Sequence, residues 1–176
     1  GGGYYPAPKT TVDRIDYSND TGTAPAKGPL SVAKVRLAAT GNVSFGYFAG
    51  GFPNTSTVDR IDYSNDTATA VTKGPLSSLR RDMGATGNAS FGYFGGGHTP
   101  SPYHSTVDRI DYSNDTATAT ARGPLSSARY ALTATGNQSF GYFGGGNIPS
   151  GSGFTTVERI DYGNDTATAV VKGPLS

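Results

Sequence analysis

The stretch T-V-D-R-I-D-Y-S-N-D-T-G-T-A, residues 11–24, decides the fold, because the chain repeats it three more times. Near-copies occupy residues 57–70, 106–119 and 156–169. Each copy reads as strand, turn and strand: β-formers flank a Ser/Gly-Asn-Asp cluster whose side chains favour turns. Four near-identical copies predict a repeat protein whose repeats form its architecture rather than a catalytic site.

The spacing of the copies is typical of propeller blades. Their valines, Val12, Val58, Val107 and Val157, are 46, 49 and 50 residues apart. Repeats of about 40–50 residues with four strands each are those of β-propellers. Helical repeats would need amphipathic stretches at helical spacing, but glycine and proline interrupt every window.

Each repeat divides into four short predicted strands. In the last repeat strand one is residues 129–135, strand two 139–144, strand three the T-V-E-R-I-D-Y motif and strand four T-A-T-A-V-V-K. We expect Gly136-Asn137 to form a two-residue turn with positive φ between strands one and two. Pro25 lies inside strand four of the first copy, which marks that strand as the outer edge, and the alanines of strand one place it near a crowded axis.

The sequence therefore predicts an all-β fold, a β-propeller of four-stranded blades with about three and a half blades in this chain. Residues 1–30 form half a blade, and complete blades follow at 31–76, 77–125 and 126–176, which makes fourteen strands. Such an array leaves open edges, so we expect further blades of the same chain or a second copy to close the ring. The chain opens on Gly1 without methionine and stops inside a repeat, so we expect a fragment.

Several motifs resemble kelch-type β-propeller repeats. The likeness rests on a basic residue that opens strand one (Lys34, Arg80 and Arg129), on aromatic pairs followed by glycines at the end of strand two, and on the acidic, aromatic strand three. Two features depart from kelch: its Tyr-Asp dipeptide is reversed as Asp16-Tyr17, and the strand-four tryptophan is missing. The V-D-R-I-D-Y-S-N-D-T-A-T-A blocks also look like repeats of large proteins of marine bacteriophages and bacteria. That resemblance implies a structural or adhesive part of a virion, tail fibre or extracellular surface.

The composition argues against several classes of partner. A net charge of +1 with interspersed signs gives no basic face for nucleic acid. No apolar run approaches the ~20 residues of a membrane span. Cysteine is absent, so thiolate metal sites are excluded. We expect no cofactor.

Two features suggest metal binding, and we interpret both as structural. The Asp16–Asp20 turn spaces oxygen ligands as calcium loops do, but no bidentate glutamate follows it. Asx and Ser side chains also close such turns without a metal. His98 and His104 lie on one loop with no carboxylate nearby in sequence, so we expect a solvated loop rather than a two-histidine site. Arg14 and Asp16 share one face of strand three, which predicts an Arg–carboxylate ladder between blades.

The loops after strands two and four share one rim, and these loops differ between repeats while the opposite rim is nearly constant. A faithful scaffold with one varied rim is typical of binding proteins. The predicted ligand-binding residues, which would contact a protein or glycan surface, are Tyr4, Tyr5, Phe52, Arg81, His98, Tyr103, His104, Tyr130 and Phe154. The plain alternative is a set of unconstrained loops.

The sequence thus predicts a non-catalytic structural or recognition module in a virion or extracellular assembly. One alternative is a polysaccharide-acting propeller enzyme, which needs paired carboxylates about 5–10 Å apart. The other is an intracellular protein-binding kelch module, which the neighbouring sequence would distinguish.

Overall fold

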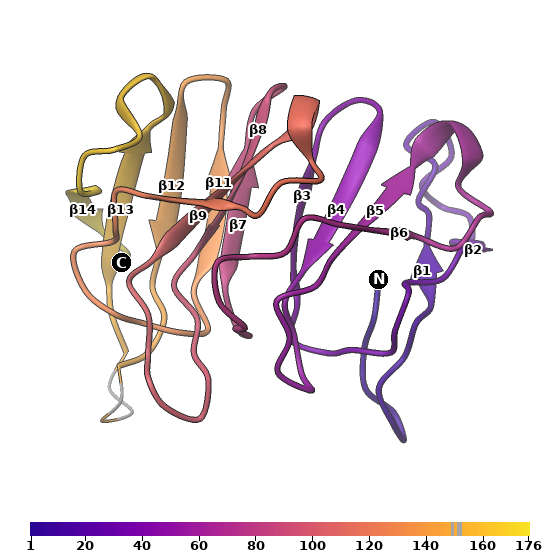
Figure 1. Ribbon diagram of the computed structural model, residues 1–176, viewed down its shortest axis with the longest axis horizontal. Helices are drawn as coiled ribbons and strands as arrows, with labels where there is room; N and C mark the ends of the chain where they lie inside the picture. The colour runs from indigo at the N-terminus through magenta and orange to yellow at the C-terminus, as the bar shows by residue number, and fades with distance from the viewer. Residues whose placement is uncertain (149, 151–152) are drawn as a thin grey trace.

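The computed structural model describes residues 1–148, 150 and 153–176, and in that part of the chain the regular structure is β-strand with three short 3-10 helices (Figure 1). The strands form one two-stranded and three four-stranded antiparallel sheets, here called units 1 to 4. Unit 1 is β1 (Val12–Asp13) and β2 (Ala26–Lys27); unit 2 is β3 (Ala38–Gly41), β4 (Phe45–Ala49), β5 (Val58–Asp62) and β6 (Val71–Lys73). Unit 3 is β7 (Gly84–Gly87), β8 (Phe91–Gly95), β9 (Val107–Asp111) and β10 (Thr120–Arg122); unit 4 is β11 (Thr133–Gly136), β12 (Phe140–Gly144), β13 (Thr156–Asp161) and β14 (Val170–Pro174). The predicted all-β class and the fourteen strands are confirmed.

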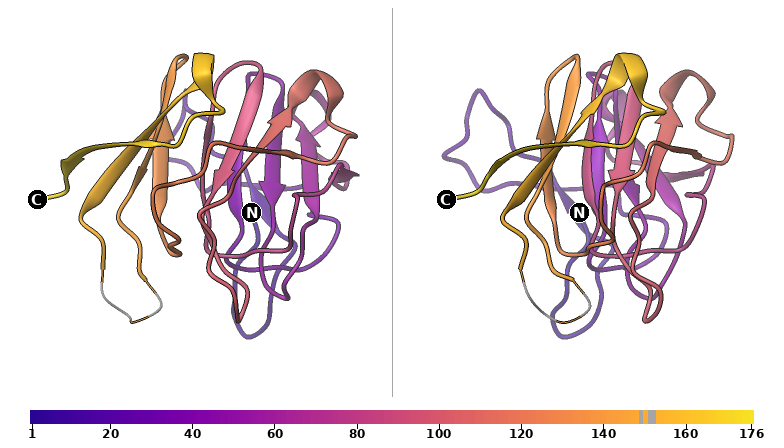
Figure 2. Two further views of the ribbon diagram at one scale, coloured as in Figure 1. Left: turned by 60° about the vertical axis from the view of Figure 1, so that its left-hand side comes forward. Right: turned by 90° about the vertical axis from the view of Figure 1, so that its left-hand side faces the viewer.

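The units stand side by side in chain order, as Figures 1 and 2 show from three directions. Within each complete unit the strands pair in sequence order, so strands one and four form the two edges. The first strands β3, β7 and β11 lie next to one another across the units. Glycine, alanine and threonine fill these strands, because small side chains let neighbouring sheets approach closely.

Three local predictions were wrong. The turn between strands one and two has no positive φ at its glycine. Instead the asparagine side chain closes the turn: Asn137 Oδ1 accepts from the N–H groups of Ser139 at 2.8 Å and Phe140 at 2.9 Å. Strand one of unit 4 begins at Thr133, not at Arg129, because the preceding residues belong to a rim loop. Pro25 precedes β2, where its carbonyl accepts from the Arg14 N–H.

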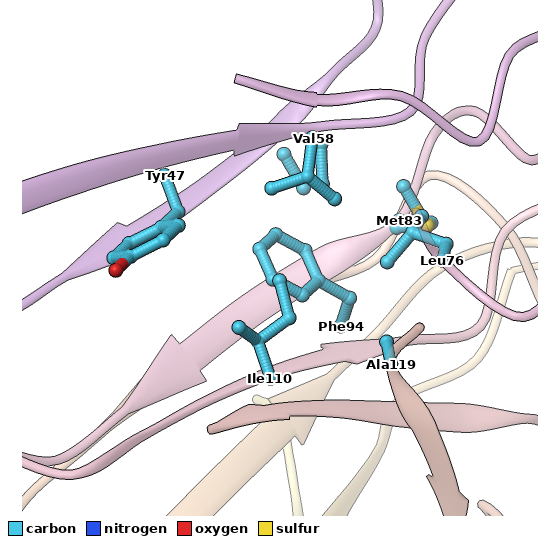
Figure 3. Packing of buried hydrophobic residues seen from close by; sticks show 9 residues of the cluster. Tyr47, Val58, Leu76, Met83, Phe94, Ile110 and Ala119 are labelled. Carbon is cyan, nitrogen blue, oxygen red and sulfur yellow. The ribbon is translucent and has the colours of Figure 1, made fainter. Parts of the chain in front are cut away.

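The hydrophobic core lies between units, not within them. Figure 3 shows the cluster between units 2 and 3, where Tyr47 and Val58 face Phe94, Met83 and Ile110. Two further clusters fill the space between units 1 and 2 and between units 3 and 4. Both faces of units 2 and 3 are therefore covered, because successive residues of a strand point to opposite sides.

A repeated polar contact, here called the aspartate lock, joins each unit to the next. Asp115, the aspartate of the Ser-Asn-Asp turn in unit 3, accepts from Tyr47 Oη at 2.9 Å and Arg60 Nη1 at 2.8 Å, and Lys73 Nζ lies 3.1 Å from its other oxygen. The same lock recurs between units 3 and 4, and in part between units 1 and 2. Its members are Tyr93, Arg109 and Arg122 around Asp165, and Arg14 and Lys27 around Asp66.

This lock corrects the predicted Arg–carboxylate ladder. The arginines do reach across to the next unit, but their partner is the last aspartate of the turn and not the one that ends strand three. That residue caps the turn of its own unit, since Asp62 Oδ1 accepts from Ser64 N at 2.9 Å and Ser64 Oγ at 2.7 Å. These bonds lower the pKa of the Asp62 carboxyl.

Each complete unit also encloses a buried ion pair. Arg80 Nη2 lies 2.6 Å from Asp108 Oδ2, and Arg80 Nη1 donates to the carbonyls of Gly96 and Thr106. Lys34 with Asp59 and Arg129 with Glu158 are the equivalent pairs. The carboxylate also accepts from the backbone N–H of a serine in the G-P-L-S motif, Ser31, Ser77 or Ser126. The pair thus joins the rim loops to strand three.

Candidate binding rim

The rim loops of each unit share one backbone frame. Two isolated β-bridges with paired hydrogen bonds join the loop before strand one to the loop after strand two, at Val35 and Phe52 and at Arg81 and His98. A third joins Tyr130 and Asn147. The paired positions therefore coincide in all three complete units, while their side chains differ. The prediction that these loops share one rim is confirmed.

A left-handed residue follows each bridge. Arg36, Asp82 and Ala131 have φ values of 58°, 57° and 54°, and none is a glycine. Their backbones form a chain across the units, since Asp82 N donates to Arg36 O at 2.9 Å and Ala131 N donates to Asp82 O at 2.8 Å. Non-glycine residues in this region are strained by about 1–2 kcal/mol, and such strain gathers at functional sites.

Paired glycines make room for this frame. Gly50 and Gly51 have φ values of 65° and 120°, and Gly51 N donates to Arg80 O in the next unit. A Cβ atom on Gly50 would meet that same carbonyl oxygen at 2.3 Å. The glycine run at the end of strand two thus permits close approach of neighbouring units.

A pocket of about 450 Å³ opens on this rim between units 1, 2 and 3. Tyr4, Val35, Arg36, Phe52 and Arg81 line it. The Arg81 guanidinium lies 5.1 Å from the centre of the Phe52 ring, and Arg81 Nη1 donates to Asn54 Oδ1 at 2.8 Å. Tyr4, Phe52 and Arg81 were predicted from the sequence, and the structure brings all three together.

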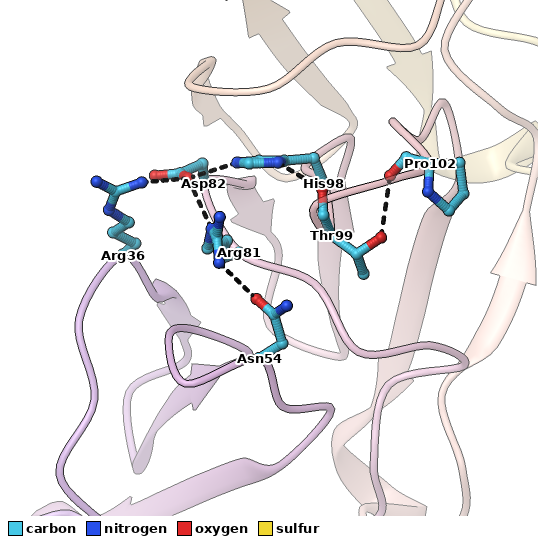
Figure 4. Close-up of polar contacts among 7 residues, drawn as sticks. All are labelled: Arg36, Asn54, Arg81, Asp82, His98, Thr99 and Pro102. Carbon is cyan, nitrogen blue, oxygen red and sulfur yellow. Dashed lines mark hydrogen bonds and ion pairs between the residues drawn. The ribbon is translucent and has the colours of Figure 1, made fainter.

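Asp82 anchors the polar side of this region, as Figure 4 shows. Its Oδ2 lies 3.0 Å from His98 Nε2, 3.5 Å from Arg36 Nη1 and 3.7 Å from Arg81 Nε. His98 Nδ1 faces the Thr99 carbonyl at 2.6 Å, so both ring nitrogens face acceptors.

His98 also belongs to a cluster of three rings. It stacks on Tyr103 with ring centres 5.4 Å apart, and Tyr130 lies 4.7 Å from His98 and 5.2 Å from Tyr103. The predicted residues His98, Tyr103 and Tyr130 therefore form one buried-to-half-buried group. The prediction of a solvated loop is wrong for His98, because Asp82 approaches it in space although not in the local sequence.

The remaining predicted residues do not line the pocket. Tyr5 is exposed outside it. Phe154 packs its ring against the Arg129 guanidinium at 4.2 Å, and therefore stabilises a buried ion pair. His104 lies under the rim, where burial and the neighbouring Arg80 lower the pKa of its imidazole. These three residues support or border the rim but do not converge on one point.

The aspartates of the candidate calcium turns make structural contacts in the part of the chain described. The aspartate that ends strand three caps the turn that follows it. The aspartate that ends the Ser-Asn-Asp cluster is held in the aspartate lock wherever a preceding unit provides donors. Among the described residues, no three His, Cys, Asp or Glu side chains gather around one point.

Sequence reasoning missed Arg36, Asn54 and Asp82. Arg36 and Asp82 lie in the segments that differ between repeats, and that difference is the sequence feature that could have marked them as site residues. Their meeting could not be predicted, because it depends on a left-handed backbone at non-glycine residues.

Comparison of the sequence with protein-family models and with curated proteins gave no match. Among the described residues, no helix has the length and apolarity needed to cross a bilayer.

Proposed function

We propose that the chain is a non-catalytic recognition module, built of kelch-like propeller blades, which binds an acidic glycan at the rim pocket. The observation that carries the proposal is the pocket itself, where two arginines and two aromatic residues converge on loops of constant backbone and varied side chains. Aromatic faces suit sugar rings, and guanidinium groups suit carboxylates. A concave volume of this size suits one or a few sugar units better than a flat protein epitope.

The charge of the pocket supports an anionic ligand. Asp82 carries one negative charge against the two guanidinium groups of Arg36 and Arg81 and the ring of His98. The Arg36 side chain is 58% exposed and so remains available to a ligand. The excess of donors over acceptors leaves room for a carboxylate to bind both arginines.

The acids of the rim favour binding over cleavage. Asp82 is the one carboxylate in the rim loops of the sequence, and two guanidinium groups and the His98 ring already contact it. Hydrolysis of a glycoside uses two carboxyl groups, one as acid and one as base or nucleophile.

The proposed setting is a virion, a tail fibre or an extracellular surface assembly. Its support is the resemblance of the repeated block to repeats of large phage and bacterial proteins. We expect the blades to form a ring with further blades or with a second copy, because the units stack side by side with the inner strands adjacent.

An array of acidic and neutral oligosaccharides tests the proposal. We expect the chain to bind members that carry carboxylates, and the Arg81→Ala variant to bind them about 10–100-fold more weakly, the loss expected for a charged hydrogen bond. Lys9→Ala is the matched control, because it removes one exposed rim charge outside the pocket. Equal binding to neutral members, equal losses in both variants or an unresponsive array would contradict the proposal.

A further inference from the structure

The aspartate lock is incomplete at both ends of the stack. Unit 4 carries a full set of donors, Tyr142, Arg159 and Lys172, at the positions that hold Asp115 and Asp165 in the inner locks. Within the described residues, no carboxylate contacts these three side chains through a hydrogen bond or an ion pair. Unit 1 carries the complementary turn, whose Asp20 is exposed and contacts no such donor among the described residues.

The arginine of unit 4 is already oriented for a carboxylate. The Arg159 guanidinium lies 4.4 Å from the centre of the Phe140 ring, and Arg60 and Arg109 lie 4.3 Å from the equivalent rings of Phe45 and Phe91. In both inner units this same arrangement directs the arginine to the next aspartate. Arg159 therefore has the same placement as the arginines of the two occupied locks.

The solvent exposure of apolar side chains also differs between the inner units and unit 4. The leucine of the G-P-L-S motif is 1–2% exposed at Leu30, Leu76 and Leu125, where a following unit covers it, but Leu175 is 48% exposed. The outer face of unit 4 thus combines uncovered apolar area with unpaired donors, the composition of an interface core and its polar contacts.

The opposite face of the stack offers the matching groups. Tyr112 and Tyr162 each stack on the tyrosine of the preceding unit, Tyr47 and Tyr93, with ring centres 4.7 and 4.6 Å apart. Tyr17 is their equivalent in unit 1 and is 93% exposed. Ile15, whose counterparts are buried in every other unit, is 59% exposed.

Backbone groups complete the match. At each inner interface the G-P-L-S glycine N–H donates to the lock aspartate's carbonyl, as Gly74 does to Asp115 at 2.8 Å, and a proline carbonyl accepts from an alanine N–H, as Pro75 does from Ala119. The glycine also permits the approach, since a Cβ atom on Gly74 would lie 1.9 Å from the Ala117 carbonyl oxygen. Gly173 and Pro174 of unit 4 are the equivalents, and no atom of the described residues lies within 4 Å of the Cβ position of Gly173.

We propose that the outer face of unit 4 binds unit 1 of a second copy of this chain, head to tail, with Asp20 of that copy held by Tyr142, Arg159 and Lys172. Tyr17 then stacks on Tyr142, and the exposed Leu175 is covered. The interface is heterologous, so each copy retains one free face of each kind until the assembly closes.

Zero-length carbodiimide cross-linking of the native chain tests this directly, because it joins a lysine to a carboxylate that contacts it. An equimolar mixture of ¹⁵N-labelled and unlabelled chains is cross-linked and digested, and the linked peptides are identified by mass. We expect a mixed-isotope link between Asp20 and Lys172. The links Lys27–Asp66 and Lys73–Asp115, whose atoms lie 3.3 and 3.1 Å apart, must appear within single chains and are the internal control.

Sedimentation over a range of concentrations gives the second readout. We expect reversible association that Arg159→Ala or Asp20→Asn weakens at least ~30-fold, as truncation of a desolvated charge pair does. Asp13→Asn is the matched control, since it removes an equal charge from an exposed site of unit 1 outside the lock. A monomer at all concentrations, or association that Asp20→Asn and Asp13→Asn affect equally, overturns the proposal. So do internal cross-links that form without the Asp20–Lys172 link.

Discussion

Replacement of Asp115 by alanine tests whether the aspartate lock holds the units together. Asp115 is 7% exposed and accepts from Tyr47 and Arg60, with Lys73 beside its second oxygen. Removal of the carboxylate leaves the hydroxyl of Tyr47, a fully buried residue, without a partner, which costs about 1–3 kcal/mol. It also leaves two cations facing each other.

Arg60 and Lys73 retain 23% and 12% side-chain exposure, so water recovers part of their loss. We therefore expect a total destabilisation of about 3–4 kcal/mol, at the lower end of the range for a broken buried pair. For a chain of this size that lowers the midpoint of thermal unfolding by roughly 6–15 °C. Asp115→Asn retains an acceptor for Tyr47 and should cost less than half as much.

The chain contains its own control. Asp20 lies in the same turn sequence, but no donor surrounds it within the described residues. In dilute solution Asp20→Ala should leave the midpoint within about 2 °C of the wild type, a surface effect. Differential scanning calorimetry measures both variants. Equal shifts for Asp115→Ala and Asp20→Ala would refute the lock, because the effect would then come from the turn and not from the contact between units.

Three further predictions concern the frame and the core. Ala131→Gly should raise the free energy of unfolding by about 0.5–1 kcal/mol in denaturant titrations, because glycine adopts the φ of 54° without strain; a loss of stability would contradict the strained frame. Asp108→Ala should cost about 3–5 kcal/mol, because it leaves the Arg80 charge buried without a partner, and the Arg80→Met/Asp108→Leu double variant should recover much of that loss. Burial raises the pKa of Tyr112 to about 12, so the native state favours its neutral form, and stability should fall as the pH rises above the unfolded value of about 10. Ultraviolet titration of the phenolates should then show the buried tyrosines ionising together with unfolding, whereas ionisation of all tyrosines near pH 10 in folded protein would contradict it.

The sequence predicted the strands because hydrophobic periodicity and turn chemistry act locally. Val58 and Ile61 are three residues apart, so they face opposite sides of β5 and pack against different neighbouring units. The Ser-Asn-Asp cluster turns the chain where it was expected to. The rim was also predictable, because a varied segment stands out against three near-identical copies. The confirmed predictions therefore concern the strands and turns that the repeats share and the loops in which the repeats differ.

The polar partners were not predictable, because each spans two segments far apart in the sequence. Asp59, Asp108 and Glu158 lie in the repeated strand-three motif, and each is buried against a basic residue of a preceding loop. Asp66 and Asp115 stand in the same turns as Asp62 and Asp111, but the first pair contacts the preceding unit and the second pair caps the turn. The stacking of the sheets decides which carboxylate faces a neighbouring unit. The sequence of a single repeat does not specify that stacking.

The central claim is that the rim carries interchangeable side chains on a constant frame, and an exchange of residues between units tests it most directly. The variant places Tyr and Ala at positions 81 and 82 and Arg and Asp at positions 130 and 131, the pairs that the other unit carries. The measurement is calorimetric titration with the carboxylated oligosaccharide that the wild type binds most tightly. The account predicts a folded chain, with a thermal midpoint within about 5 °C of the wild type, and an affinity at least about tenfold weaker because Arg81 has left the pocket. Unchanged affinity in the folded variant would contradict the assignment of the pocket, and loss of the fold would contradict the constant frame.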